Sequence, residues 1–138
     1  MRAFLPRAVA YGLALAVALA ACSRDDGALR AARDALAASL PEPYFEDLVI
    51  ESVSVEGDAL VQLVRSPEGR AEATRAHPRF EELREAEQQA LADLCADPAI
   101  APLVATDTRL VRRFVDRQGD VFFEVEMPAR DCATTPPG

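Results

Sequence analysis

Residues 110–127 read LVRRFVDRQGDVFFEVEM, and this stretch decides the fold because it predicts a β-hairpin. Two runs rich in valine and phenylalanine flank Gln118-Gly119, a dipeptide that suits a two-residue turn. Such a turn sets which residues of the two strands lie opposite each other. The predicted cross-strand pairs are Phe114 with Phe123, an apolar pair, and Arg113 with Glu124, an ion pair.

Alternation along the two strands assigns their side chains to two faces. Arg112 falls on the core face, where a charged group is unusual, so we expect it to lie at the sheet edge or to extend toward solvent. The other residues predicted on the core face are Leu110, Phe114, Val121, Phe123 and Val125. Those predicted on the opposite face include Val111, Val115 and Phe122.

A second hairpin is predicted earlier in the chain. Residues 47–56 are rich in β-branched side chains, Glu56-Gly57-Asp58 is a turn signal, and residues 59–65 are again apolar. The segment 66–69 contains proline and glycine and ends the second strand.

Helices are predicted on both sides of this hairpin. An alanine-rich helix over 28–40 ends at Pro41-Glu42-Pro43, and residues 70–76 form one or two helical turns. A longer helix starts at Pro78 and extends to Cys95, followed by a short helix to Val104. The apolar stripe predicted on the longer helix is Phe80, Leu83, Ala90, Leu91 and Leu94. The fold class is therefore α+β, a small antiparallel sheet of two hairpins, about four strands, with helices on one face.

The start of the chain has the layout of an export signal. Residues 1–7 carry two arginines and no acid, and residues 8–21 carry no charge. As a helix the uncharged run would reach about 21 Å, which is short for a hydrocarbon core about 30 Å thick, so a removed signal fits better than a membrane span. Ala18-Leu19-Ala20 also suits ordinary signal peptidase, which would leave Cys22 as one more cysteine near the new terminus.

The run Leu19-Ala20-Ala21-Cys22 resembles the lipobox of bacterial lipoproteins. The resemblance covers residues 1–22 only. It implies cleavage before Cys22, a diacylglyceryl group on its sulfur and an acyl chain such as palmitate on its amino group. Three chains would hold the protein on a membrane without a spanning helix. In such lipoproteins an aspartate after the cysteine favours the inner membrane, so Ser23 implies the outer membrane, facing the periplasm, in a cell with two membranes.

These features divide the chain into a signal peptide at 1–21, a lipidated tether at 22–27, one α+β domain at 28–132 and a loose tail at 133–138. Removing the signal leaves 117 residues, enough for one modest core. It also takes the formal net charge from −8 to −10, because residues 1–21 hold two arginines and no acid. A chain this acidic is a poor candidate for binding nucleic acid.

With Cys22 lipidated, Cys95 and Cys132 remain. An even number in an exported protein predicts a disulfide between them. The alternative, a reactive thiol pair, has little support because the two cysteines lie far apart and have no histidine beside them.

No pattern in the chain predicts catalysis, a cofactor or a metal. His77, the single histidine, precedes Pro78 in a polar stretch and is interpreted as an exposed loop residue. No serine lies in a Gly-x-Ser-x-Gly sequence. The acids Asp116, Asp120, Glu124 and Glu126 are close in sequence but do not match a calcium loop.

The sequence therefore favours a non-enzymatic, lipid-anchored envelope protein that acts as an accessory or scaffold for another envelope protein. Small lipid-anchored domains often serve envelope assembly or secretion machines in this way, an argument by analogy of class. An exposed sheet edge could accept a strand from the partner. The alternative is a small-ligand-binding or inhibitor module with an apolar pocket, and an envelope hydrolase is less favoured.

Overall fold

The computed structural model describes residues 12–134, with side chains from Asp25 onward. The basic head of the predicted signal, the side chain of Cys22 and residues 135–138 of the predicted tail lie outside the described part. The elements are α1 (Gly12–Ala37), β1 (Glu42–Pro43), β2 (Val49–Glu56), β3 (Ala59–Arg65), α2 (Ala71–Arg75), α3 (Phe80–Ala90), the 3-10 helices η1 (Leu91–Ala96) and η2 (Ala101–Leu103), β4 (Arg109–Val115), β5 (Val121–Pro128) and the 3-10 helix η3 (Ala129–Ala133).

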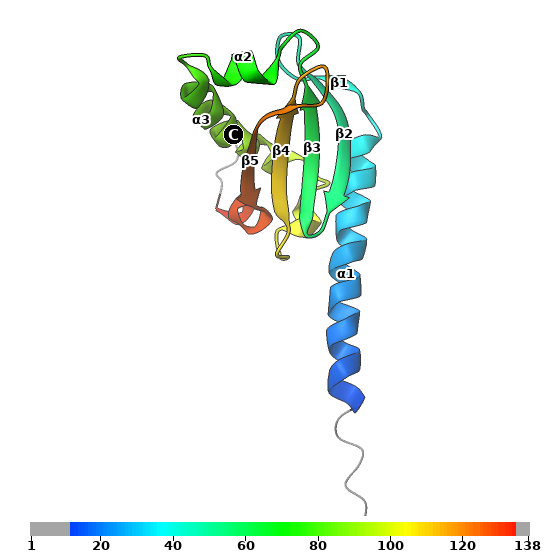
Figure 1. Ribbon diagram of the computed structural model, residues 1–138. Helices are drawn as coiled ribbons and strands as arrows, with labels where there is room; N and C mark the ends of the chain where they lie inside the picture. The colour runs from blue at the N-terminus through cyan, green and yellow to red at the C-terminus, as the bar shows by residue number, and fades with distance from the viewer. Residues whose placement is uncertain (1–11, 135–138) are drawn as a thin grey trace, which may run out of the picture.

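The strands form one sheet in the order β1-β2-β3-β4-β5 (Figure 1). Both predicted hairpins are present, β2 with β3 and β4 with β5, and the α+β class is confirmed. The sheet has one strand more than expected, because the two residues of β1 pair with β2. The hairpins join through β3 and β4, which run parallel, since the helical crossover between them returns the chain to the same end of the sheet.

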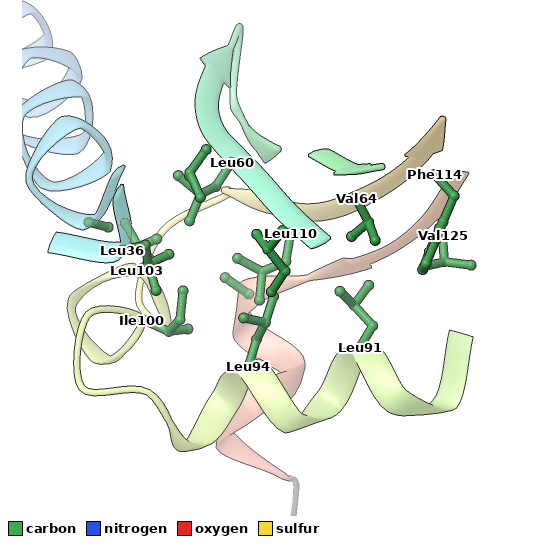
Figure 2. Packing of buried hydrophobic residues seen from close by; sticks show 14 of the residues in the cluster. Leu36, Leu60, Val64, Leu91, Leu94, Ile100, Leu103, Leu110, Phe114 and Val125 are labelled. Carbon is green, nitrogen blue, oxygen red and sulfur yellow. The ribbon is translucent and has the colours of Figure 1, made fainter. Parts of the chain in front are cut away.

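The main core lies between one face of the sheet and the helices. Figure 2 shows Leu91 and Leu94 of η1 pointing toward Leu110, Phe114 and Val125 of the sheet. Further core residues come from α1 (Leu29, Ala32 and Leu36), from η2 (Leu103) and from Ile100, which directly precedes η2. Burial of these apolar side chains supplies the main stabilisation, at about 25 cal/mol per Å² removed from water.

The predicted register of the second hairpin is confirmed, with Phe114 opposite Phe123 and Arg113 opposite Glu124. The turn is longer than two residues, because a bulge shifts the register so that Val115 pairs with Val121. As a result Val121 is exposed, and Phe122 joins the main core next to Phe123. The predicted faces of these two residues were therefore wrong.

Helix α1 begins earlier than the sequence predicts. It runs through residues 22–27, which were expected to form a tether, and it ends at Ala37, before Pro41. A single glycine, Gly27, interrupts a segment of otherwise adequate helix formers, so nothing there stops the helix. Among residues 12–134, no helix combines the length and apolar character needed to cross a membrane.

The predicted disulfide is present. It joins Cys95 of η1 to Cys132 of η3, with the two Cα atoms 5.2 Å apart. It ties the end of the domain to the helical layer, because η3 follows directly after β5.

Candidate functional site: an apolar groove beside α3

A hollow of about 580 Å³ opens between α3 and the connection from β1 to β2. The ends of β4 and β5 form its floor. Its lining residues are Tyr44, Phe45, Glu46, Asp47, Leu48, Ser66, Thr74, Leu83, Ala86, Glu87, Ala90, Phe114, Phe122 and Phe123. We call this hollow the groove.

Two large apolar side chains are exposed on opposite walls of the groove. Phe45 is 64% exposed on the β1–β2 connection, and Leu83 is 43% exposed on α3. The sequence predicted Leu83 within a buried stripe, but α3 contains no buried residue, and burial begins at Leu91 where η1 takes over. Exposed apolar side chains gathered around a hollow mark an interaction site more often than single ones do.

The floor of the groove is a set of packed aromatic rings. Phe114 and Phe123 stack with their centroids 4.6 Å apart, and Tyr44 lies 6.1 Å from Phe114. Phe80 meets Phe123 edge-on at 5.7 Å. Such ring contacts stabilise the floor, typically by about 0.5–1.5 kcal/mol per pair beyond the burial of their surface.

A buried polar cluster supports one wall. Arg112 is only 4% exposed and lies on β4, inside the sheet, so the prediction that it lies at an edge or extends outward was wrong. Its guanidinium donates a hydrogen bond to Gln62 (3.0 Å) and another to the Tyr44 hydroxyl (2.8 Å). That hydroxyl donates in turn to Glu87 of α3 (2.5 Å). Arg112 can be buried because these partners, which come from distant parts of the chain, satisfy its donors.

The same cluster perturbs Tyr44. Burial, and then the hydrogen bond to the Glu87 carboxylate, raise the pKa of Tyr44 to about 12. Arg112 opposes this shift but does not cancel it. The phenol therefore stays protonated and keeps donating to Glu87 at physiological pH.

The charged residues that line the groove, all of them described, are acidic: Glu46, Asp47 and Glu87. Glu46 has a positive φ of 50°, which marks the tight bend that presents Phe45. The groove thus combines an apolar floor with negative charge at its walls.

A second hollow of about 920 Å³ lies between α2 and α3 and shares Glu46, Thr74, Leu83 and Ala86 with the groove. His77 lines it and is exposed, as predicted. The Nδ1 atom of His77 accepts a hydrogen bond from the backbone N–H of Arg79 (3.2 Å). Within residues 25–134 the structure shows no bond from His77 to a carboxylate or a hydroxyl.

The structure divides the four acids near the second hairpin into two groups, Asp116 with Asp120 in the turn and Glu124 with Glu126 on β5. The Asp116 carboxylate accepts hydrogen bonds from the backbone N–H groups of Ala71, Gln118 and Asp120. Glu124 and Glu126 lie on the other face, paired with Arg113 and Arg109. In the part of the chain whose side chains are described, no group of three or more His, Cys, Asp and Glu is arranged to hold a metal ion.

The predicted site residues lie elsewhere. The backbone of Cys22 is helical within α1, and its lipidation stays a prediction because its side chain is not described. Cys95 and Cys132 do not line the groove. The groove itself was not predicted. The signals in the sequence were Phe45 within an acidic connector and a charged Arg112 on a core face.

The suggested strand-accepting edges are poorly suited to that role. β1 is two residues long and contains Pro43. On β5, the carbonyl of Val121 accepts a hydrogen bond from Arg75 of α2, and the carbonyl of Glu126 accepts one from Gln88 of α3.

No protein-family model and no curated protein matches this chain in sequence. Three solved structures match in fold. A predicted secreted protein of Pseudomonas aeruginosa superposes with a TM-score of 0.60 at 18% identity, covering 79% of this chain and 93% of its own. EpsS, the pilotin of the Vibrio vulnificus type 2 secretion system, gives 0.52 at 18% identity, covering 83% and 98%. AspS, a type II secretion system pilotin of Vibrio cholerae, gives 0.52 at 16% identity, covering 82% and 99%. The chain shares its fold with these three proteins.

Proposed function

We propose that the protein is a lipid-anchored, non-enzymatic accessory of an envelope complex, and that its groove docks a segment of another envelope protein. The observation that carries this proposal is the exposure of Phe45 and Leu83, which line one apolar groove from two different elements. A docked apolar segment would cover both side chains and remove them from water.

The charges of the groove select the partner. Glu87 is already paired with Arg112 (3.9 Å), so the charge offered to a partner comes from Glu46 and Asp47. These two acids favour an apolar segment flanked by arginine or lysine. Such residues would meet the acidic walls while the apolar side chains rest on the aromatic floor.

The fold supports an envelope setting, since two of the structures that share it are pilotins of type II secretion systems. The export signal and the lipobox resemblance agree with this setting and add an anchor at Cys22, with the domain on the periplasmic side of the outer membrane. On this proposal, the partner is a component of an envelope secretion or assembly machine.

A photo-reactive amino acid placed at Leu83 tests the docking site. In intact cells it should crosslink to one envelope protein, and the same group at Glu85 should not, because Glu85 lies on α3 but does not line the groove. Equal crosslinking from both positions, or none from Leu83, would contradict the proposal.

Charge reversal tests the chemistry of the partner. Asp47→Lys should weaken the crosslink from Leu83 and make the remainder less sensitive to salt, because it removes attraction to basic flanks. Glu85→Lys makes the same change in net charge outside the groove and should leave the crosslink unchanged. A crosslink that Asp47→Lys strengthens would instead indicate an acidic or neutral partner.

The groove also suits a second candidate function, the binding of a small apolar molecule. Its volume of about 580 Å³ falls within the range typical of ligand sites. Native mass spectrometry of protein purified from the envelope tests this function. A bound compound that Leu83→Trp displaces would support it, and empty protein would count against it.

A further inference from the structure

Helix α1 runs beside β2 and continues past the end of the sheet (Figure 1). Leu29 and Val55 line one small hollow together with Asp26, so Leu29 lies level with the C-terminal end of β2. Residues before Leu29 therefore extend beyond the sheet, past the turn between β2 and β3.

The connection from this end of the sheet to Cys22 is helical. Seven residues separate Cys22 from Leu29, which at about 1.5 Å per residue is about 10 Å of helix. The buried side chains of Leu29, Ala32 and Leu36 hold α1 on the core. A lipid anchor on Cys22 would thus be joined to the domain by a stiff segment, not by a flexible tether.

The groove lies at the opposite end of the sheet. β4 starts beside the β2–β3 turn, where the backbone N–H of Arg109 donates to the carbonyl of Asp58 (3.0 Å). It ends after Phe114 in the floor of the groove, and at about 3.3 Å per residue the distance covered is about 20 Å. Figure 1 shows α2 and the β1–β2 connection at this far end, away from the projecting part of α1.

We infer that α1 is a stand-off helix that orients the domain on the membrane, with the groove about 30 Å from Cys22, at the end of the domain away from the lipid. This inference rests on the proposed lipidation of Cys22 and the proposed docking role of the groove. Its consequence concerns the partner, which must present its basic-flanked apolar segment in the aqueous periplasm and not at the lipid surface.

The net charge of the domain supports the upright orientation. Residues 22–138 carry a formal charge of −10, because they hold 13 of the 15 arginines and all 23 acids. Anionic lipid headgroups would repel this surface, which disfavours a domain lying flat on the bilayer.

Energy transfer between a dye on the protein and acceptor lipids tests the orientation. The full chain, exported and acylated in cells, is reconstituted in vesicles of phosphatidylethanolamine and phosphatidylglycerol. A single cysteine replaces Asp107, which is 97% exposed at the start of β4, or Gln118, exposed in the turn at its far end. The dye reacts only there, because Cys95 and Cys132 are bonded to each other and Cys22 is acylated.

Transfer from position 107 should be several-fold greater than from position 118. Six glycine and serine residues inserted between Gly27 and Ala28 should bring the two values together, because a flexible linker releases the domain. Gly27→Ala is the matched control. A Cβ there meets nothing within 4 Å, so this variant stiffens the helix and should keep the difference.

Equal transfer from both positions in the unmodified chain would overturn the inference, and so would a difference that the insertion leaves intact. Flotation of the vesicles separates this failure from that of the anchor. Protein that does not float refutes lipidation at Cys22 and the orientation with it, but leaves the crosslinking test of the groove unaffected.

Discussion

Arg112 donates a hydrogen bond of 2.8 Å to the hydroxyl of Tyr44, a residue 68 positions earlier in the chain. The Tyr44 hydroxyl in turn donates a hydrogen bond to the carboxylate of Glu87 on α3. The sheet, the β1–β2 connection and α3 are thereby joined through one phenol, at the wall of the groove. The side chains that shape the proposed docking site therefore depend on a buried polar cluster as well as on apolar packing.

Replacing Tyr44 with phenylalanine should lower the free energy of unfolding by about 1–3 kcal/mol, because it removes one hydrogen bond from the buried Arg112, which keeps Gln62, and one from Glu87. Urea unfolding followed by circular dichroism measures this loss. Arg79→Gln breaks an exposed ion pair with Glu82 and should cost at most about 1 kcal/mol. Equal effects of the two variants would show that the buried cluster contributes no more than a surface pair.

Tyr44 should ionise later than a free phenol. Tyr11 lies in the predicted signal, so Tyr44 is the single tyrosine of residues 22–138. The chain has no tryptophan, so no indole absorbance overlaps that of the phenol. Absorbance at 295 nm should show a pKa of about 12 in the folded protein and about 10 after denaturation. Ionisation near pH 10 while circular dichroism remains native would contradict the buried hydrogen bond.

The raised pKa of Tyr44 also predicts how stability depends on alkaline pH. The folded state holds the phenolic proton more tightly than the unfolded state does. The contribution is fully present below about pH 10 and is lost as the pH rises toward 12. The unfolding free energy of Tyr44→Phe should therefore fall less over this range than that of the unmodified protein.

Asp116 predicts the behaviour in acid. The backbone N–H of Ala71, followed by those of the β4–β5 turn, lowers the pKa of its carboxyl group. Its contribution to stability is fully present at neutral pH. It is lost as the pH falls from about 4 through the lower pKa of the folded state, because the unfolded chain binds the proton first. Asp116→Asn should lower the melting temperature at pH 7 and flatten its decline in acid. Asp120→Asn, an exposed control in the same turn, should change neither.

The disulfide should contribute to stability but not to anchoring. Replacing Cys95 and Cys132 with serine should cost about 2–4 kcal/mol, because the bond closes a long loop in the unfolded chain. Cys22→Ser should leave the unfolding free energy unchanged and abolish fatty-acid labelling. Label that persists in Cys22→Ser would refute the lipidation site, and an unchanged melting temperature without the disulfide would refute its stabilising role.

Most of the secondary structure could be predicted because it depends on neighbours in sequence. Six of the seven residue pairs between β4 and β5, Phe114 with Phe123 among them, have the register predicted from Gln118-Gly119. The prediction failed only at the bulge, where one extra residue exchanged the roles of Val121 and Phe122. The apolar stripe was predicted correctly as helix, and Leu91 and Leu94 are buried, but Leu83 is exposed. Periodicity does not say which part of a stripe finds a partner.

The sequence by itself determined both hairpins, the helical layer and the disulfide, because each depends on local periodicity or on the small number of cysteines, whereas the export signal and the lipid anchor stay predictions. Only the tertiary structure decided that β3 and β4 lie parallel, that Arg112 is buried, and that Phe45 and Leu83 line the same groove. Arg112 meets Gln62 and Tyr44 across 50 and 68 residues. The free energy of burying a charge depends on whether the folded chain places hydrogen-bond partners beside it. These partners are distant in sequence, so local sequence patterns do not predict them.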